Sequence, residues 1–210
     1  MEEINKLDEG KLLGYFESIK SVFLTKIILI TAVTKQRDGR PYIDATALTD
    51  AINEVRATID DPLFYKALSR GNEELYENFK DDIGTSLMLS SWNVFEQIVK
   101  DLTIADYSTQ MLDLSVCYQS GRFQFDKREK KNIDLFYYIR NAICHHNGAY
   151  YASKEIDHTY GGSVFRSNGH CGEKIDMNLK LTWEMALDIE RYTLKAWNNA
   201  RAFNPPNAKP

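Results

Sequence analysis

Four side chains near the middle of the sequence have the types and spacing that acid–base chemistry on a phosphate requires: Arg140, Asn141, His145 and His146. An imidazole titrates near neutral pH and can transfer a proton, while a guanidinium carries a permanent charge that pairs with phosphate oxygens. Asn141 and His145 are four positions apart, so on a helix they share a face and the amide could orient the ring. This ranks His145 above His146, although the spacing leaves their order open.

The element that must position these side chains is a helix predicted from Lys131 to His146. The segment contains no Pro or Gly, and Asn147-Gly148 is a strong helix stop because both residues tolerate the left-handed conformation. At 100° per residue, apolar side chains cover nearly the whole circumference of this helix. The pattern therefore predicts burial on two sides, one against the helix's own bundle and the other against a further element or a second subunit.

Arg140 is the exception on this helix, because it projects from an arc of apolar side chains that includes Phe136 and Cys144. Burial of an unpaired guanidinium costs several kcal/mol, so something must meet its charge. The group that meets it is a carboxylate, an aromatic face or a phosphate, and these interpretations stay open. Arg140 is then either a core arginine, paired with an acid such as Glu96, or a cation that binds a phosphate.

The run from Arg140 to His145, followed by Asn147-Gly148, resembles the Arg-x4-6-His signature of the HEPN (higher eukaryotes and prokaryotes nucleotide-binding) superfamily. The resemblance covers about residues 82–203, and Asn141 matches the polar residue that follows the arginine in the signature. It implies a metal-independent endoribonuclease with no cofactor. His145 or His146 would take a proton from the ribose 2′-hydroxyl or give one to the departing 5′-oxygen, and Arg140 would stabilise the phosphate.

The same resemblance implies a role and a set of partners. The role is that of a toxin or phage-defence effector, with RNA as substrate and an antitoxin protein as a candidate partner. Two Arg/His pairs would converge in a homodimer formed through the Lys131–His146 helix. The alternative is a non-catalytic HEPN-like helical module that binds a partner protein or a nucleotide.

The predicted fold is mainly α: a HEPN-like helical bundle with an N-terminal helical extension and a small β-hairpin between the last two helices. The expected divisions are an extension over residues 1–80, a helical domain over 81–204 and a frayed tail over 205–210. Apolar periodicity predicts these helices: Lys11–Lys35, Thr46–Ile59, Pro62–Leu68, Glu73–Phe79, Thr85–Leu102, Ser108–Cys117 and a last one that Thr182 caps and Asn204 ends.

Turn residues and alternation predict the remaining segments. Lys35–Pro41 is expected to be a loop, because it contains Asp38-Gly39 and Pro41. Short strands are expected on either side of Gly161-Gly162, at Ala149–Ala152 and Ser163–Arg166. A half-buried strand is expected over Ile175–Leu181, where apolar and polar residues alternate.

The charge pattern includes a compact basic cluster just before the central helix, made of Lys127, Arg128, Lys130 and Lys131. Lys and Arg supply the salt-sensitive part of RNA affinity, so the cluster is a candidate RNA contact. The alternative interpretation is an ordinary solvated helix start. The net charge of −4 argues against a broad electrostatic surface for nucleic acid but allows a local basic patch.

Cysteine usage and hydropathy restrict the compartment and the chemistry. The three cysteines lack CxxC spacing, which indicates free thiols in a reducing compartment, and a cytoplasmic protein is expected. A zinc site made from histidines such as His158 and cysteines such as Cys171 is disfavoured, because no two of them have paired ligand spacing. The apolar run Val22–Val33 is too short to span a membrane, so no membrane partner is expected.

Overall fold

The computed structural model of the protein describes residues 7–43, 72–104, 121–145, 149–151, 155–168, 171–175 and 178–203. Within them the chain is mainly helical, which confirms the expected fold class. The helices are α1 (Glu9–Val33), α4 (Asn72–Ile104), α6 (Lys127–His145) and α7 (Leu179–Phe203), with a short 3-10 helix η3 (Gly121–Phe123). The strands are β1 (Thr34–Arg37), β2 (Arg40–Ile43), β3 (Ala149–Tyr151), β4 (Glu155–Tyr160), β5 (Ser163–Asn168) and β6 (Cys171–Lys174).

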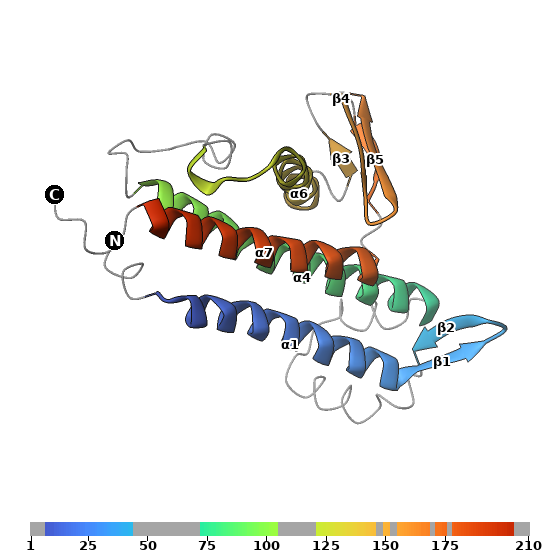
Figure 1. Cartoon of the computed structure of the whole chain (residues 1–210). Coiled ribbons are helices and arrows are strands. Elements are labelled where there is room, and N and C mark those ends of the chain that lie inside the picture. Colours follow the sequence, from blue (N-terminus) through green and yellow to red (C-terminus); the bar gives the residue numbers. More distant parts are fainter. Residues whose placement is uncertain are drawn as a thin grey trace.

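Three long helices lie lengthwise beside one another and the fourth crosses them. In Figure 1, the axes of α1, α4 and α7 lie roughly parallel, with α1 running opposite to α4 and α7, and α4 packs against both α1 and α7. Helix α6 is seen nearly end-on above this layer, next to the β4–β5 hairpin. None of the helices in the described ranges is long and apolar enough to cross a bilayer.

The core lies where α6 crosses α4 and α7, and it is rich in aromatic side chains. The largest fully buried side chains are Trp92, Trp197, Tyr192, Phe16, Phe95, Phe123, Phe136, Leu12 and Met88. All of them belong to one apolar cluster, to which α1, α4, α6 and α7 each contribute. Helix α1 therefore shares its core with α4, α6 and α7.

Side chains cap the starts of α1, α6 and α7. Asp8 accepts the Lys11 N–H at 2.8 Å at the start of α1, and Asn178 accepts the Leu181 N–H at 2.9 Å at the start of α7. Asp126 accepts the N–H groups of Arg128 and Glu129, each at 2.8 Å. Glu129 Oε2 in turn accepts the Asp126 N–H at 2.8 Å, which completes a reciprocal capping arrangement for α6.

The strands form three antiparallel pairs: β1 with β2, β3 with β6, and β4 with β5. The β4–β5 hairpin lies between α6 and α7 in the sequence and turns at Gly161-Gly162, whose φ values are +58° and +79°. Both values favour glycine, and two-residue turns with positive φ match the twist of paired strands. A hairpin between the last two helices is confirmed, with β5 where a strand was expected at Ser163–Arg166. Its first strand is β4 and not the strand expected at Ala149–Ala152, because Ala149–Tyr151 pairs with β6.

The structure corrects the prediction of two helices over residues 73–102. A single helix, α4, runs from Asn72 to Ile104, so the break expected between Phe79 and Thr85 is absent. Ile83 and Leu87, one turn apart, both pack in a second apolar cluster with Phe23 of α1, and this packing keeps the helix continuous. The domain boundary expected at residue 80 lies inside α4.

The strand expected over Ile175–Leu181 is also wrong, as is the cap expected at Thr182. Helix α7 begins at Leu179, and Thr182 is a fully buried residue of its first turn. The Thr182 hydroxyl donates within the helix, toward the carbonyls of Asn178 and Leu179, both at 3.1 Å. The apparent alternation overlapped the start of a helix whose Leu181 and Met185, one turn apart, both face the core.

Lys35–Pro41 is part of a hairpin and not a loop, although Asp38-Gly39 does form its turn. The expected helix Lys11–Lys35 is confirmed as α1, which passes directly into β1. The helices expected at Thr46–Ile59, Pro62–Leu68 and Ser108–Cys117, the stop at Asn147-Gly148 and the tail over 205–210 lie outside the described residues.

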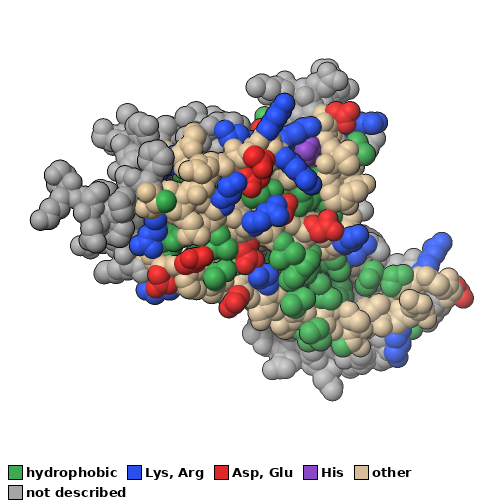
Figure 2. Space-filling model, viewed as in Figure 1, with side chains coloured by type: hydrophobic (Ala, Val, Ile, Leu, Met, Phe, Trp, Pro, Cys, Tyr) green, Lys and Arg blue, Asp and Glu red, His purple; other side chains and the backbone are tan. Residues whose placement is uncertain are grey.

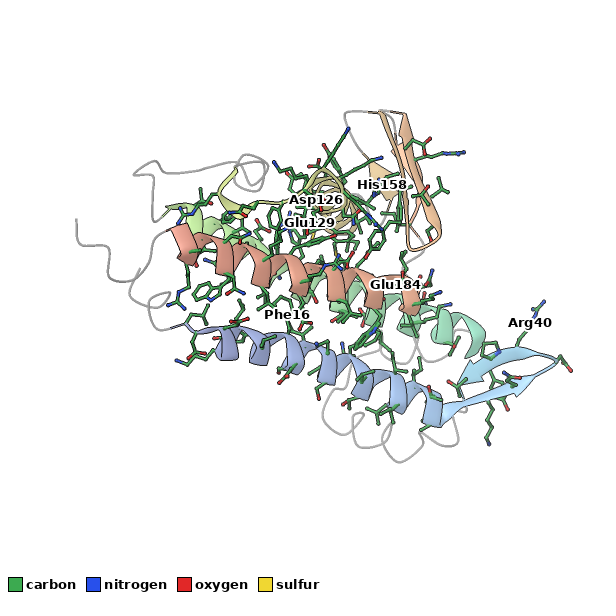
Figure 3. The ribbon with its side chains drawn as sticks, in the orientation of Figure 1. Phe16, Arg40, Asp126, Glu129, His158 and Glu184 are labelled. Carbon is green, nitrogen blue, oxygen red and sulfur yellow. The ribbon has the colours of Figure 1, made fainter. Side chains whose placement is uncertain are left out.

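Buried polar side chains attach the β4–β5 hairpin to α6 and α7. Asn132 donates from Nδ2 to the Tyr192 hydroxyl at 2.9 Å, and His158 donates from Nε2 to Asn132 Oδ1 at 3.0 Å. The Tyr160 hydroxyl donates to Asp188 at 3.1 Å, and the Tyr160 ring meets Phe136 edge to face. Figure 3 labels His158 on the hairpin side of α6. His158 Nδ1 is buried and has no hydrogen-bond partner among the described residues.

We expect acid to destabilise the fold through His158. Burial, with a smaller contribution from the charge of Lys131, lowers the pKa of His158 in the folded state below the ordinary value of about 6.5. The unfolded chain therefore binds this proton first, so the stabilisation is complete above about pH 6.5 and is lost as pH falls through the folded pKa. The test is urea unfolding at pH 7.5 and pH 5.5 of the wild type and of His158→Gln, which keeps an amide donor. The free energy of unfolding should fall less between the two pH values for His158→Gln than for the wild type. Equal losses in the two proteins would contradict this assignment.

Candidate active site

The candidate site lies on α6, which starts one turn earlier than the sequence predicted because of the Asp126–Glu129 cap. Its apolar side chains are already buried within one chain. Ile133, Leu135, Phe136, Ile139 and Ala142 are each at most 1% exposed. Two-sided burial therefore does not require a second subunit, and the homodimer stays a prediction. Tyr137, Tyr138 and Ile143 remain only partly buried on α6.

Arg140 is half-buried at the α4–α6 contact, where two groups approach its guanidinium. Its Nη1 donates to Asn141 Oδ1 at 2.9 Å, and its Nη2 lies 3.9 Å from Glu96 Oε2. The second distance is that of an ion pair without a direct hydrogen bond. The structure thus brings together the arginine and the acid that the sequence singled out, and the Arg140 side chain is still 28% exposed.

Glu96 is held mainly by its own helix. Trp92 Nε1 donates to Glu96 Oε2 at 3.1 Å, and Lys100 Nζ binds Glu96 Oε1 at 2.5 Å. Trp92 is fully buried and its ring lies 6.3 Å from that of Tyr137 on α6, which fixes the contact between the two helices. The carboxylate therefore interacts with three donor groups, and Arg140 is the most distant of them.

The two histidines of the signature are placed only in part. His145 is the last residue of α6, and its side chain, like the whole of His146, lies outside what the structure describes. On the helix, Asn141 and His145 are one turn apart and share a face. The order of His145 and His146 stays open.

The basic cluster occupies the opposite end of the same helix. Lys127, Arg128, Lys130 and Lys131 belong to the first two turns of α6. Nine positions separate Lys131 from Arg140, which corresponds to about 14 Å along the helix axis. The structure therefore places the cluster and the arginine on one element but does not bring them together.

Carboxylates and further cations surround this cluster. Backbone hydrogen bonds from Glu129 and Arg128 lower the pKa of the Asp126 carboxyl, so the cap is ionised at neutral pH. Lys195 of α7 binds Glu129 at 2.6 Å, and Arg191 binds Asp188 at 2.8 Å. Figure 2 shows Lys and Arg side chains gathered over α6 and the adjoining part of α7, with acids among them. The α7 cations were missed, although their four-residue spacing places them on one helix face.

The geometry of His158 does not support the alternative of a zinc site, because its Nε2 is hydrogen-bonded to Asn132 inside the core. In the part of the chain that the structure describes, no group of three His, Cys, Asp or Glu side chains is placed to hold a metal ion. Comparisons with protein-family models, with curated proteins and with solved structures found no match.

The coupling between Arg140 and Glu96 is expected to be weak. Their side chains are 28% and 20% exposed and 3.9 Å apart, and pairs of this kind contribute about 1 kcal/mol or less. A double-mutant cycle with Arg140→Gln and Glu96→Gln, measured by urea unfolding, tests this. A coupling energy of about 3 kcal/mol or more would mean that the pair is a buried structural ion pair.

Proposed function

We propose that the protein is a metal-independent endoribonuclease of HEPN type. The observation that supports this most directly is the state of Arg140. Asn141 fixes one end of the guanidinium, the other end lies 3.9 Å from Glu96, and the side chain remains partly exposed. A cation that is oriented but not enclosed can meet a phosphate without first breaking a strong internal ion pair.

In the proposed reaction the ribose 2′-hydroxyl attacks the adjacent phosphorus and the 5′-oxygen leaves. His145 takes the proton from the 2′-hydroxyl or gives one to the departing 5′-oxygen. Arg140 stabilises the charge that builds on the pentavalent phosphate. The bond between phosphorus and the 5′-oxygen breaks as the new bond to the 2′-oxygen forms, and the product ends in a 2′,3′-cyclic phosphate.

One imidazole does not serve easily as base and acid in the same step, so a second proton-transfer group is needed. His146 or the histidine of a second copy would supply it. In the second case the partly buried Tyr137, Tyr138 and Ile143 on α6 are the residues available for an interface between copies. The cellular role that we propose is that of a toxin or phage-defence effector.

A non-catalytic helical module is the second candidate, and the proximity of Glu96 to Arg140 favours it. In that case the arginine would serve to join α6 to α4, and the protein would bind a partner protein or a nucleotide. This interpretation explains the ion pair but assigns no role to a histidine one turn after Asn141.

Cleavage of total RNA in the presence of EDTA tests the proposal. Wild-type protein should cut RNA, His145→Ala should lower the rate by about 100- to 10,000-fold, and Arg140→Ala by about 100- to 1,000-fold. Arg166→Ala, which removes a highly exposed arginine of β5, is the matched control and should cut like the wild type. The products should resist tailing at the 3′ end until the cyclic phosphate is opened and the resulting phosphate is removed to leave a free 3′-hydroxyl. Cleavage that requires a divalent ion, or that survives His145→Ala and His146→Ala alike, would refute the mechanism.

Growth on expression separates the two candidates. If the protein is a nuclease, expression of the wild type should arrest growth. Cells should tolerate Arg140→Ala and His145→Ala at the same expression level. The variants must be shown to be folded, by circular dichroism and a thermal melt. Equal tolerance of all three proteins would favour the non-catalytic module.

A further inference from the structure

The outer face of α1 exposes large apolar side chains. Val22 is 55% exposed, Ile28 is 67% exposed and Leu29 is 62% exposed. From Ser21 to Val33 the sequence contains one charged residue, Lys26. Figure 2 shows hydrophobic side chains gathered around this half of α1. Contiguous exposed apolar surface of this kind marks an interaction site.

Part of this face follows a seven-residue repeat. Exposed residues recur at alternating steps of four and three along α1, which is the spacing of a helix that packs lengthwise against another helix. We name this row the α1 stripe, and it consists of Tyr15, Ser18, Val22, Thr25, Leu29 and Ala32. All six residues are exposed and none of them is charged.

Side-chain size alternates along the α1 stripe. Every second residue is large, namely Tyr15, Val22 and Leu29, and the residues that follow them are Ser, Thr and Ala. A bilayer gains little from small and polar side chains of that kind, because membrane affinity scales with buried apolar area. A facing helix gains from them, because its large side chains fit over the small ones. The alternation therefore favours a helix as the partner.

The α1 stripe is complementary to its own reversed copy. When two copies are related by a two-fold axis that passes between Phe23 and Leu24, every large stripe residue meets a small one. The facing pairs are Tyr15 with Ala32, Leu29 with Ser18, and Val22 with Thr25. Each pair occurs twice, because a two-fold contact is isologous. A parallel pair would instead set large against large and small against small, which cannot keep the helices at one separation.

The charges near the α1 stripe permit this self-pairing. Lys26 lies beside the stripe, where it lines a groove of about 150 Å³ between α1 and α4. Its Nζ donates to Ser86 Oγ of α4 at 3.4 Å, so the charge is directed toward α4. Two copies can therefore approach along the stripe without setting like charges against each other.

We propose that α1 forms the interface of a homodimer in which the α1 stripes of two copies pack antiparallel. This contact is distinct from the α6 contact considered for the nuclease, and it does not rest on the nuclease function. The stripe spans about 26 Å of a helix about 10 Å wide, which is a smaller footprint than the roughly 800 Å² per partner of a standard interface. We therefore expect a reversible dimer that dissociates in the micromolar range.

Sedimentation equilibrium of the full chain over a series of protein concentrations tests the interface. Val22→Glu sets two like charges near the two-fold axis and should raise the dissociation constant by about 100-fold or more. The matched control is Leu24→Glu, the same kind of change at a residue that is 46% exposed and lies about 160° around α1 from Val22. It should dimerise like the wild type. Both variants should keep the thermal melt of the wild type, because both residues are exposed within one copy.

Disulfide trapping tests the orientation, in a chain that carries Cys117→Ser/Cys144→Ser/Cys171→Ser. A mixture of the Tyr15→Cys and Ala32→Cys proteins should form a linked dimer with oxidised glutathione. Either protein alone should form little, because an antiparallel pair separates identical positions at the stripe ends by about 26 Å. Efficient linking of Tyr15→Cys alone would contradict the antiparallel arrangement.

Three further outcomes would overturn the proposal. The first is a wild type that stays monomeric at every concentration. The second is a dimer that Val22→Glu leaves intact or that Leu24→Glu weakens equally. The third is binding to lipid vesicles that Val22→Glu abolishes, by a protein that is monomeric, since the face would then belong to a bilayer.

Discussion

The packing of α6 across α4 and α7 is the contact on which the rest of the structure depends. Its buried side chains, with Phe136 at the centre, meet aromatic residues such as Trp92 and Tyr192 from the helices below. Each large apolar side chain that is fully buried contributes about 1.5–3 kcal/mol. The same contact sets the environment of Arg140, because the α4 turn that carries Trp92 also carries Glu96. The distance between Arg140 and Glu96 therefore depends on how α4 and α6 pack.

Polar side chains make this packing specific. The chain of hydrogen bonds from His158 through Asn132 to Tyr192 joins β4, α6 and α7 inside the core. The Tyr192 hydroxyl continues it to Asp188 at 3.3 Å, which also receives the Tyr160 hydroxyl. Buried polar groups are costly unless they are paired, so these hydrogen bonds favour one relative placement of the hairpin and the two helices. Apolar contacts alone would tolerate several.

Local pattern was enough to predict much of the fold. Apolar residues three and four positions apart predicted α1, α6 and α7, and Gly161-Gly162 predicted the turn between β4 and β5. The pattern failed where packing overrode local signals, as at Gly84, which is buried inside the continuous α4, and at Ile175–Leu181, where the alternation ran into a helix. For the site, the pairing of Arg140 with Glu96 was foreseen as one of two alternatives. The link between His158 and Asn132 was not, because 26 residues separate them and no local rule joins them.

The junction between α1 and β1 has a mechanical consequence. Val33 ends the helix and Thr34 begins the strand, with no residue between them. The β1–β2 hairpin is therefore the direct continuation of a helix of 25 residues, about 37 Å long. Leu12 and Phe16 anchor the far end of that helix in the core. Because no linker lies between them, a change in the direction of the hairpin requires α1 to change direction as well, or the backbone to bend where Val33 meets Thr34.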